Sequence, residues 1–233
     1  MNLLVIVPTR GRRKQCERLL ESFEKTTDNA ELVFVTDVDD QETYEGMDFG
    51  TALHAMLNPR EFLSGKLNKT AMACADDYDA LFFVGDDHVF RTEHWDTIML
   101  DVLEEMGGTG ILYPDDKRRD DIPEIWMMST DIIKSLGWFA SPTQQHFYLD
   151  NILGELGKRS GLIRWVPEVL IEHLHYTVCN ETERDELYVS TEEAFGASDF
   201  QAFQEWRGNI LPVQVAVLRR EFNEDVHWIL GKV

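Results

Sequence analysis

Residues Ala80–Phe90 read ALFFVGDDHVF. The run Ala80–Val84 is apolar throughout, has the length of a strand and ends at a glycine, which is typical of a strand buried on both faces of a parallel sheet. Asp86, Asp87 and His88 follow directly. Charged side chains beside a buried strand are costly unless they meet water, a cation or a partner. The stretch therefore predicts a buried strand that delivers two carboxylates and an imidazole to the edge of a sheet, although a plain polar turn would also contain Gly-Asp.

The residues before this stretch show the same kind of pattern. Leu3–Val7 is another unbroken apolar run, closed by a proline, and Glu31–Thr36 has an apolar centre. Between them the spacing i, i+3, i+4, i+7 predicts an amphipathic helix. Its apolar face consists of Cys16, Leu19, Leu20 and Phe23. With a further helix over Gly65–Asp76, this alternation predicts an α/β fold whose ligand site lies beyond the carboxyl ends of its strands.

The rest of the chain is expected to contain further helices and strands up to residue 176 and helices alone after it. Residues Gly46–Pro59 have no regular pattern. The expected elements after Phe90 are helices at Glu93–Met106 and Gln144–Arg159 and strands at Gly110–Tyr113, Ile125–Ser129, Leu162–Val166 and Val169–His173. From Thr177 the chain changes character, and two helices are predicted near Asp199–Trp206 and Val213–Phe222. We therefore expect one domain over residues 1–176 and a helical C-terminal extension over residues 177–233 packed on it.

Composition limits the classes of function. The formal net charge is −21, which opposes binding of unmodified nucleic acid because phosphate contacts need clustered Lys and Arg. At 11% aromatic residues, the chain has enough apolar material for a packed core, so the acidity indicates a solvated surface and an acidic site. No run of about 18 apolar residues occurs, so no membrane span is expected. Three widely spaced cysteines and a short apolar N-terminus without a secretory pattern favour a reducing, cytoplasmic location.

Two histidines near the end of the last predicted strand are candidate metal ligands. In Ile171–Tyr176, IEHLHY, His173 and His175 are two residues apart and so lie on one face of a strand. One of them could complete the coordination of a metal ion with Asp87, and the sequence does not choose between the two. Carboxylates suit Mn²⁺ or Mg²⁺, which share oxygen ligands with substrate phosphates. Either histidine could instead be a surface residue or a core residue with its bonds satisfied.

Asp150 is a candidate general base. It stands near the start of an amphipathic helix in HFYLDNILGELGKRSG. A carboxylate in that place could project into a cleft and take a proton from an attacking hydroxyl. An Asp at a helix N-terminus is also favourable for capping and for the helix dipole alone, and from spacing the capping interpretation is the stronger one.

Six stretches in this order resemble the GT-A glycosyltransferase fold. They are VIVPTRGR, FVTDVDD, the Gly65–Asn68 helix leading into FFVGDD, LGWF, YLDNILGELGKRSG and EHLHY. The chain is most similar to the large inverting, family 2-like group of nucleotide-sugar transferases, and the likeness covers about Met1–Tyr176. The resemblance implies a Rossmann-like, mixed but mainly parallel sheet flanked by helices, with a helical C-terminal extension outside it.

The resemblance also implies roles for individual residues. Those placed in the donor site are Pro8, Thr9, Arg10, Asp37, Asp39, Lys66, Asn68 and Asp86. Asp87 aligns with the metal-binding last acid of the DxD-type motif, whose first acid is replaced here by Gly85. Asp150 aligns with the general base of inverting members. Trp138, in the glycine-aromatic turn, could stack on an acceptor sugar.

The implied function is metal-dependent transfer of a hexosyl or pentosyl group. The donor would be a nucleotide-sugar, with UDP-sugars favoured by their frequency in the family, and the acceptor a glycan, a protein, a lipid-linked sugar or a modified base. Two alternatives are a haloacid-dehalogenase-like phosphatase, suggested by Asp37-Val38-Asp39, and a GT-A-like carbohydrate- or protein-binding module without turnover. The C-terminal helices could also form a homodimer contact.

Overall fold

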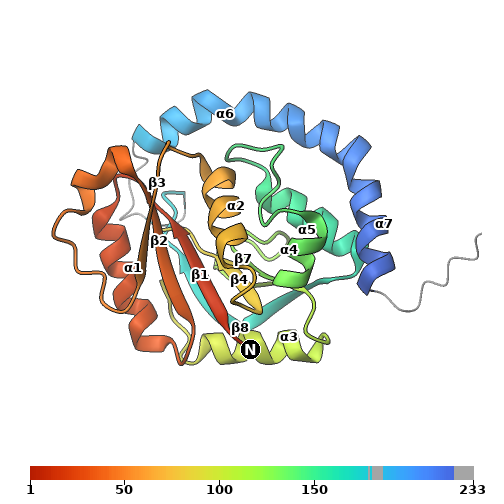
Figure 1. Ribbon diagram of the computed structural model, residues 1–233, viewed down its shortest axis with the longest axis horizontal. Helices are drawn as coiled ribbons and strands as arrows, with labels where there is room; N and C mark the ends of the chain where they lie inside the picture. Colours follow the sequence, from red (N-terminus) through yellow and green to blue (C-terminus); the bar gives the residue numbers. More distant parts are fainter. Residues whose placement is uncertain (178, 180–185, 223–233) are drawn as a thin grey trace, which may run out of the picture.

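The computed structural model describes residues 1–177, 179 and 186–222, and its strands form one sheet (Figure 1). In the described chain the strand order is β3-β2-β1-β4-β7-β6-β8-β5. The strands are β1 (Leu3–Pro8), β2 (Glu31–Asp37), β3 (Leu53–Leu57), β4 (Ala80–Phe83), β5 (His88–Phe90), β6 (Ile111–Asp115), β7 (Trp126–Ser129) and β8 (Ile163–His173). The helices are α1 (Arg13–Thr26), η1 (Val38–Tyr44), α2 (Leu63–Cys74), α3 (Trp95–Glu105), α4 (Thr130–Leu136), α5 (Leu149–Ser160), α6 (Glu186–Glu205), η2 (Trp206–Ile210) and α7 (Leu211–Phe222).

The first half of the sheet is parallel and centred on β1. β1 pairs with β2 on one side and β4 on the other, so Val5 lies between Leu32 and Phe82. All three side chains are at most 1% exposed, as expected for strands covered by helices on both faces. The carboxyl ends of these strands therefore reach the same edge of the sheet. The predicted α/β architecture with a mainly parallel sheet is confirmed.

The second half of the sheet brings a distant segment to the end of β4. β7 runs antiparallel to β4, and β8 runs parallel to β6 with a register shift at Pro114/Asp115. The far end of β8 pairs with β5, which sets His88 opposite His173. β8 is one strand where two were expected. β5 and the edge strand β3 were not predicted, because β5 is very short and β3 has half-exposed rather than buried side chains.

Helices cover both faces of the sheet (Figure 1). One core cluster contains Leu67 of α2, Ile132 of α4 and Ile152 of α5. The other contains Leu19 of α1 and Met99 of α3. The apolar face predicted for α1 is buried as expected. Among the described helices, none combines the length and apolar character required to cross a bilayer.

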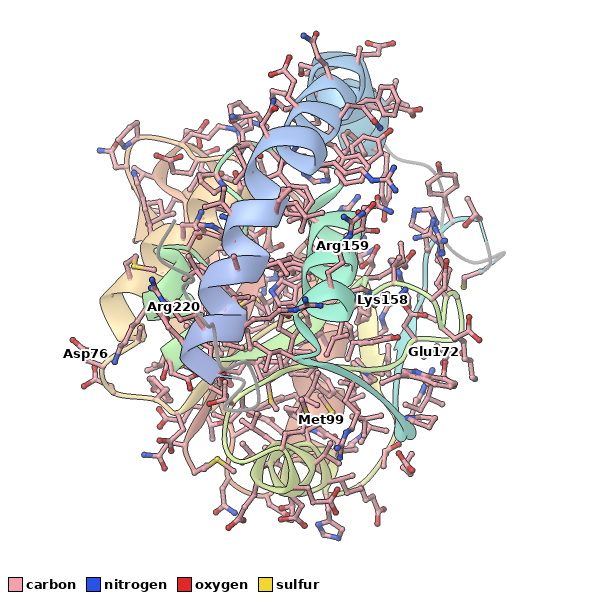
Figure 2. All side chains as sticks on the ribbon, turned by 90° about the vertical axis from the view of Figure 1, so that its right-hand side faces the viewer. Asp76, Met99, Lys158, Arg159, Glu172 and Arg220 are labelled. Atoms are coloured by element: carbon pink, nitrogen blue, oxygen red, sulfur yellow. The ribbon has the colours of Figure 1, made fainter. Side chains whose placement is uncertain are left out.

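The C-terminal helices pack on the domain rather than extending from it. α6 is longer than predicted and continues through the π-helical turn η2 into α7. Trp206, Leu211 and Leu218 are at most 1% exposed and belong to the core cluster of α4 and α5. Figure 2 shows α7 alongside α5, and a guanidinium nitrogen of Arg219 donates to the carbonyl oxygen of Arg159. The extension is thus part of the same hydrophobic core.

Truncation of this contact should destabilise the whole chain. We expect Trp206→Ala to lower the free energy of unfolding by about 3–5 kcal/mol, the usual cost of deleting a large buried aromatic. Val213→Ala is the matched control, because Val213 lies on the neighbouring helix at 62% exposure and should change stability by no more than about 0.5 kcal/mol. Denaturant unfolding measures both. Equal, small effects of the two variants would show that the helices do not share the core.

Candidate functional site

A cavity of about 600 Å³ lies at the carboxyl ends of the parallel strands. Its floor is formed by the residues that follow β1, β2 and β4, and its walls come from α2, the start of α5 and α6. Figure 1 shows α6 across the end of the sheet toward which β1 points. In an open α/β sheet this is where ligands bind. Most residues singled out in the sequence line it, namely Pro8, Thr9, Arg10, Asp37, Lys66, Asp86, Asp87, Asp150, His173 and His175.

Asp87 is the centre of the polar network in this cavity. Its Oδ1 lies 3.1 Å from Nδ1 of His88, and its Oδ2 lies 3.3 Å from Nε2 of His173. The Tyr188 hydroxyl of α6 donates to the same Oδ2 at 2.6 Å. Burial opposes ionisation, but the hydrogen bonds from His173 and His88 outweigh it and hold the pKa of Asp87 well below its usual value. The carboxylate is therefore ionised at neutral pH.

Glu124 fixes the orientation of the His173 ring. Nδ1 of His173 donates to Oε2 of Glu124 at 3.0 Å, so the opposite nitrogen faces Asp87. Both Glu124 oxygens are held by Nη1 of Arg118, at 2.7 and 2.8 Å. Burial lowers the pKa of His173, but the bonds to Asp87 and Glu124 raise it to about 9. Such a carboxylate–histidine pair is the arrangement that orients metal-binding imidazoles in proteins.

The donor atoms fit a divalent cation. Ligand atoms of Asp87, His88 and His173 lie within 4.8 Å of one another, and a second group, Asp116, Glu124 and His173, shares the last residue. Nε2 of His88 is buried and has no hydrogen-bond partner among the described residues. A mixed carboxylate and imidazole set suits Mn²⁺ better than Mg²⁺, which prefers oxygen alone.

His175 is placed differently from His173. It follows the end of β8, and its Nδ1 contacts the Thr177 hydroxyl at 2.7 Å. Burial lowers its pKa to about 4, so the ring is neutral. It lines the cavity but belongs to neither metal-binding group found among the described residues. The geometry thus favours His173 over His175 as a ligand.

Gly85 is explained by close packing. A Cβ at this position would lie 3.0 Å from Oδ1 of Asp87 and 3.0 Å from Nδ1 of His88. Nδ1 of His88 also contacts the Gly85 carbonyl oxygen at 3.1 Å. Because the two side chains fold back over the backbone, an acid at position 85 could not be accommodated without moving them.

Asp86 faces the opposite side of the loop and pairs with the end of β1. Its Oδ2 accepts a hydrogen bond from Oγ1 of Thr9 at 2.7 Å, and its Oδ1 lies 3.1 Å from Nη1 of Arg12. Burial raises the pKa of Asp86 to about 6, and the charge of Arg12 limits the rise. Arg12 also lies over the Tyr188 ring, 4.4 Å from its centroid. Arg12 was not among the residues singled out in the sequence, although it belongs to the same PTRGR stretch.

Asp37 ends β2 in a cluster of cations. Its Oδ2 lies 2.9 Å from Nζ of Lys66 and 3.2 Å from Nη1 of Arg10. Nζ of Lys66 also donates to the Thr9 carbonyl oxygen at 3.1 Å. Asp39 is exposed and binds Arg10 through both oxygens, at 2.7 and 3.0 Å. Asp39 does not line the cavity, but its partner Arg10 does.

Asn68 and Trp138 lie outside the cavity lining. Oδ1 of Asn68 accepts from the backbone N–H groups of Phe139 and Ala140, at 2.8 and 3.0 Å, and its Nδ2 donates to the Ala140 carbonyl. Trp138 is 4% exposed and packs in the core cluster. Asn68 thus fixes the turn that carries Trp138, and neither side chain faces the cavity.

Asp150 occupies the first turn of α5 and lines the cavity. Burial raises its pKa to about 6, although its Oδ1 accepts the backbone N–H of Asn151 at 2.8 Å. The charge of Glu124 contributes to the rise. A carboxylate with a raised pKa in a cleft is a candidate proton acceptor. His146, which lines the same wall, is neutral, since burial lowers its pKa to about 4.

No protein-family model matches the chain, and no curated protein matches it by sequence. Solved structures do match. GalNAc-T7 with UDP, GalNAc and Mn²⁺ has a TM-score of 0.58 at 12% identity, over 74% of this chain and 44% of that one. The mannosyltransferase PcManGT from Pyrobaculum calidifontis, in complex with GDP-Man and Mn²⁺, has a TM-score of 0.51 at 14% identity, over 94% and 73%. S. aureus TarS has a TM-score of 0.52 at 15% identity, over 73% and 36%.

These likenesses establish the fold. The chain has the GT-A architecture of these glycosyltransferase structures, as the resemblance in the sequence implied. The match spans less than half the length of TarS and of GalNAc-T7. None of these structures supports the phosphatase alternative.

The raised pKa of Asp150 predicts a pH-dependent penalty on stability. A free Asp titrates near 3.9, whereas burial raises the pKa of Asp150 to about 6. Between these values the folded state binds more protons than the unfolded state, so stability falls as pH rises. We expect Asp150→Asn to be stabilised relative to the parent protein at pH 8 and to lose most of that advantage by pH 4.5.

Thermal unfolding of both proteins across this range measures the effect. Asp131→Asn, a change at another first-turn acid on the short helix α4, controls for the loss of a helix dipole contact. A constant difference in melting temperature between Asp150→Asn and the parent from pH 4.5 to pH 8 would contradict the raised pKa.

Proposed function

We propose that the chain is a metal-dependent glycosyltransferase that moves a hexosyl or pentosyl group from a nucleotide-sugar to an acceptor hydroxyl, with inversion. The observation that carries the proposal is the meeting of Asp87 and His173 at the floor of a cavity in a GT-A fold. Two structures of the same fold, GalNAc-T7 and PcManGT, were solved with Mn²⁺ and with a nucleotide or a nucleotide-sugar. Asp87 and His173, with His88 in reach, would hold Mn²⁺ or Mg²⁺, and His175 would line the cavity beside them.

The donor would lie along the ends of β1 and β2. Pro8, Thr9 and Arg10 line the cavity there, beside Asp37 and Lys66. Lys66 and Arg12 offer positive charge to phosphate, and both now pair with buried carboxylates. Donor binding would exchange those ion pairs for phosphate contacts. The nucleotide of the donor would be UDP.

The bound cation would neutralise the charge that develops on the departing nucleoside diphosphate. Asp87 and His173 face the same space from β4 and β8, so the pairing of β5 with β8 sets their separation. Glu124 keeps the Nε2 of His173 directed at that space. Asp86 bonds to Thr9 and Arg12, so Asp87 rather than Asp86 would hold the cation.

Asp150 would take the proton from the acceptor hydroxyl. It stands in the wall made by α5, while the metal-binding carboxylate stands on the floor. Its raised pKa favours proton uptake near neutral pH. The acceptor, proposed to be a glycan, a protein or a modified base, would enter between α5 and α6. Asn68 and Trp138 would act indirectly, by holding the turn before this wall.

Donor binding should require the divalent ion. Without it, the ionised carboxylate of Asp87 repels a diphosphate, whereas Asp37 and Asp86 are each paired with a cation. We expect UDP-, GDP- or CMP-sugars to raise the melting temperature only with Mn²⁺, and a chelator to abolish the shift. A ligand at about 100 times its Kd stabilises by about 2.7 kcal/mol, which is readily detected.

The variant that tests the site is Asp87→Asn, which should lose the Mn²⁺-dependent shift. Its matched control is Glu172→Gln on the same strand as His173, because Glu172 pairs with Arg91 and Lys117 outside the cavity. Binding of a nucleotide-sugar that is equally tight with and without metal would overturn the proposal. Tight, metal-dependent binding without sugar release under any acceptor condition would identify a binding module instead.

Loss of the proposed base should separate catalysis from binding. We expect Asp150→Asn to keep the affinity for Mn²⁺ and donor but to reduce transfer by about 10²- to 10⁴-fold, the usual contribution of a general base. Release of free nucleotide, measured with whichever nucleotide-sugar raises the melting temperature of the parent protein, reports turnover. Full turnover by Asp150→Asn would remove this residue from the mechanism.

A further inference from the structure

The segment immediately before α5 is fastened by a buried carboxylate of the C-terminal extension. Asp199 of α6 is 2% exposed. Its Oδ1 accepts from the backbone N–H of Gln145 at 3.0 Å, and its Oδ2 accepts from those of His146 and Phe147, both at 2.8 Å. A buried carboxylate is costly unless its oxygens are fully bonded, and here three backbone donors supply the bonds. The segment and the helix are therefore stabilised together.

The same segment is held from the other side by α2. The Ser64 hydroxyl donates to the Gln144 carbonyl oxygen at 2.6 Å, and the Ser64 backbone N–H donates to that of Gln145 at 3.2 Å. The side-chain amide of Gln144 in turn donates to the Asp199 carbonyl oxygen at 3.3 Å. Gln144 and Ser64 are both buried. The N–H groups point to α6 and the carbonyls to α2, which leaves the backbone little freedom.

A strained residue connects this segment to Asp150. Tyr148 has φ of 65°, a left-handed conformation that bulky residues adopt only when the surroundings enforce it. Its ring is stacked on Phe203 with centroids 5.3 Å apart and lies 5.7 Å from Phe200. Both phenylalanines belong to α6. Because α5 begins at the next residue, the conformation of Tyr148 sets the direction in which the first turn leaves the segment.

We propose that Asp199 is a positioning residue, which acts through residues 144–148 to place Asp150 and the acceptor-side wall for transfer. This inference rests on the proposed role of Asp150 as the base. The segment also presents His146 and Phe147 to the cavity, so its backbone defines that wall. A displacement of about 1 Å at a reacting group can cost about 10²-fold in rate. The hydrogen bonds of Asp199 therefore affect the rate of transfer although Asp199 does not touch the substrate.

Asp199→Asn is the sharpest test, because the amide keeps the shape but has one acceptor oxygen for three N–H donors. In this variant we expect the kcat for sugar transfer, or for hydrolysis of the nucleotide-sugar, to fall about 10²-fold. The Kd of the nucleotide-sugar in the presence of Mn²⁺ should change by less than about threefold. Ser64→Ala should give a smaller change of the same kind. Glu193→Gln, an exposed acid on the same helix, should leave both quantities unchanged.

A readout without any substrate separates this inference from the proposed function. Carboxyl-carbon NMR should find the pKa of Asp150 near 6 in the parent protein and closer to its ordinary value in Asp199→Asn, because a displaced first turn admits water. An unchanged pKa with an unchanged kcat overturns the positioning role. A loss of donor affinity as large as the loss of kcat also overturns it, because the substitution has then disturbed the whole site and not the position of Asp150 alone. Absence of donor binding by the parent protein defeats the proposed function, and the NMR titration still decides the role of Asp199.

Discussion

The site depends on the burial of two adjacent carboxylates, Asp86 and Asp87, at the end of β4. Desolvation alone would protonate both. The structure treats them differently: Asp86 is bonded to Thr9 and Arg12 and keeps a raised pKa, whereas Asp87 lies between histidines and stays ionised. The elements that compensate these charges come from the start of α1, from β8 and from α6. The same electrostatic requirement therefore ties three distant parts of the chain to one strand end.

Much of the fold follows from short-range sequence patterns. The strands β1, β2 and β4 and the helix α1 were predicted because burial on fixed faces leaves unbroken or periodic apolar runs. β3 was missed because an edge strand with half-exposed side chains, such as Leu53 at 51%, carries no such pattern. α6 was predicted only over its last part. Its contacts with the domain are made by scattered residues, among them Asp199 and Phe203, rather than by a continuous apolar stripe.

Site residues at the ends of strands could be predicted from the sequence. Residues that reach the site only through the tertiary fold could not. Asp87 could be proposed because it follows a buried strand, and His173 because it closes a strand with an apolar run that includes the buried Val169 and Ile171. Glu124 and Tyr188 could not, because their sequence neighbourhoods give no indication that a loop and a distant helix would reach the same pair. The burial of Trp138 was equally hidden, since an aromatic residue in a turn suits either a core or a sugar. Only the path of the chain around it decides.

The C-terminal extension shows why likeness of fold leaves the chemistry of this chain open. Identities of 12–15% with structures of the same architecture show a shared fold, and the side chains that line the cavity have to be taken from this chain itself. Electrostatic catalysis at the carboxyl edge of such a sheet gains from the exclusion of water. In this chain α6 lies across the edge and contacts the site at two places, through Tyr188 at Asp87 and through Asp199 at the segment before α5. Two of the contacts that hold the site together therefore come from the part of the chain beyond Tyr176, which the resemblance in the sequence does not include.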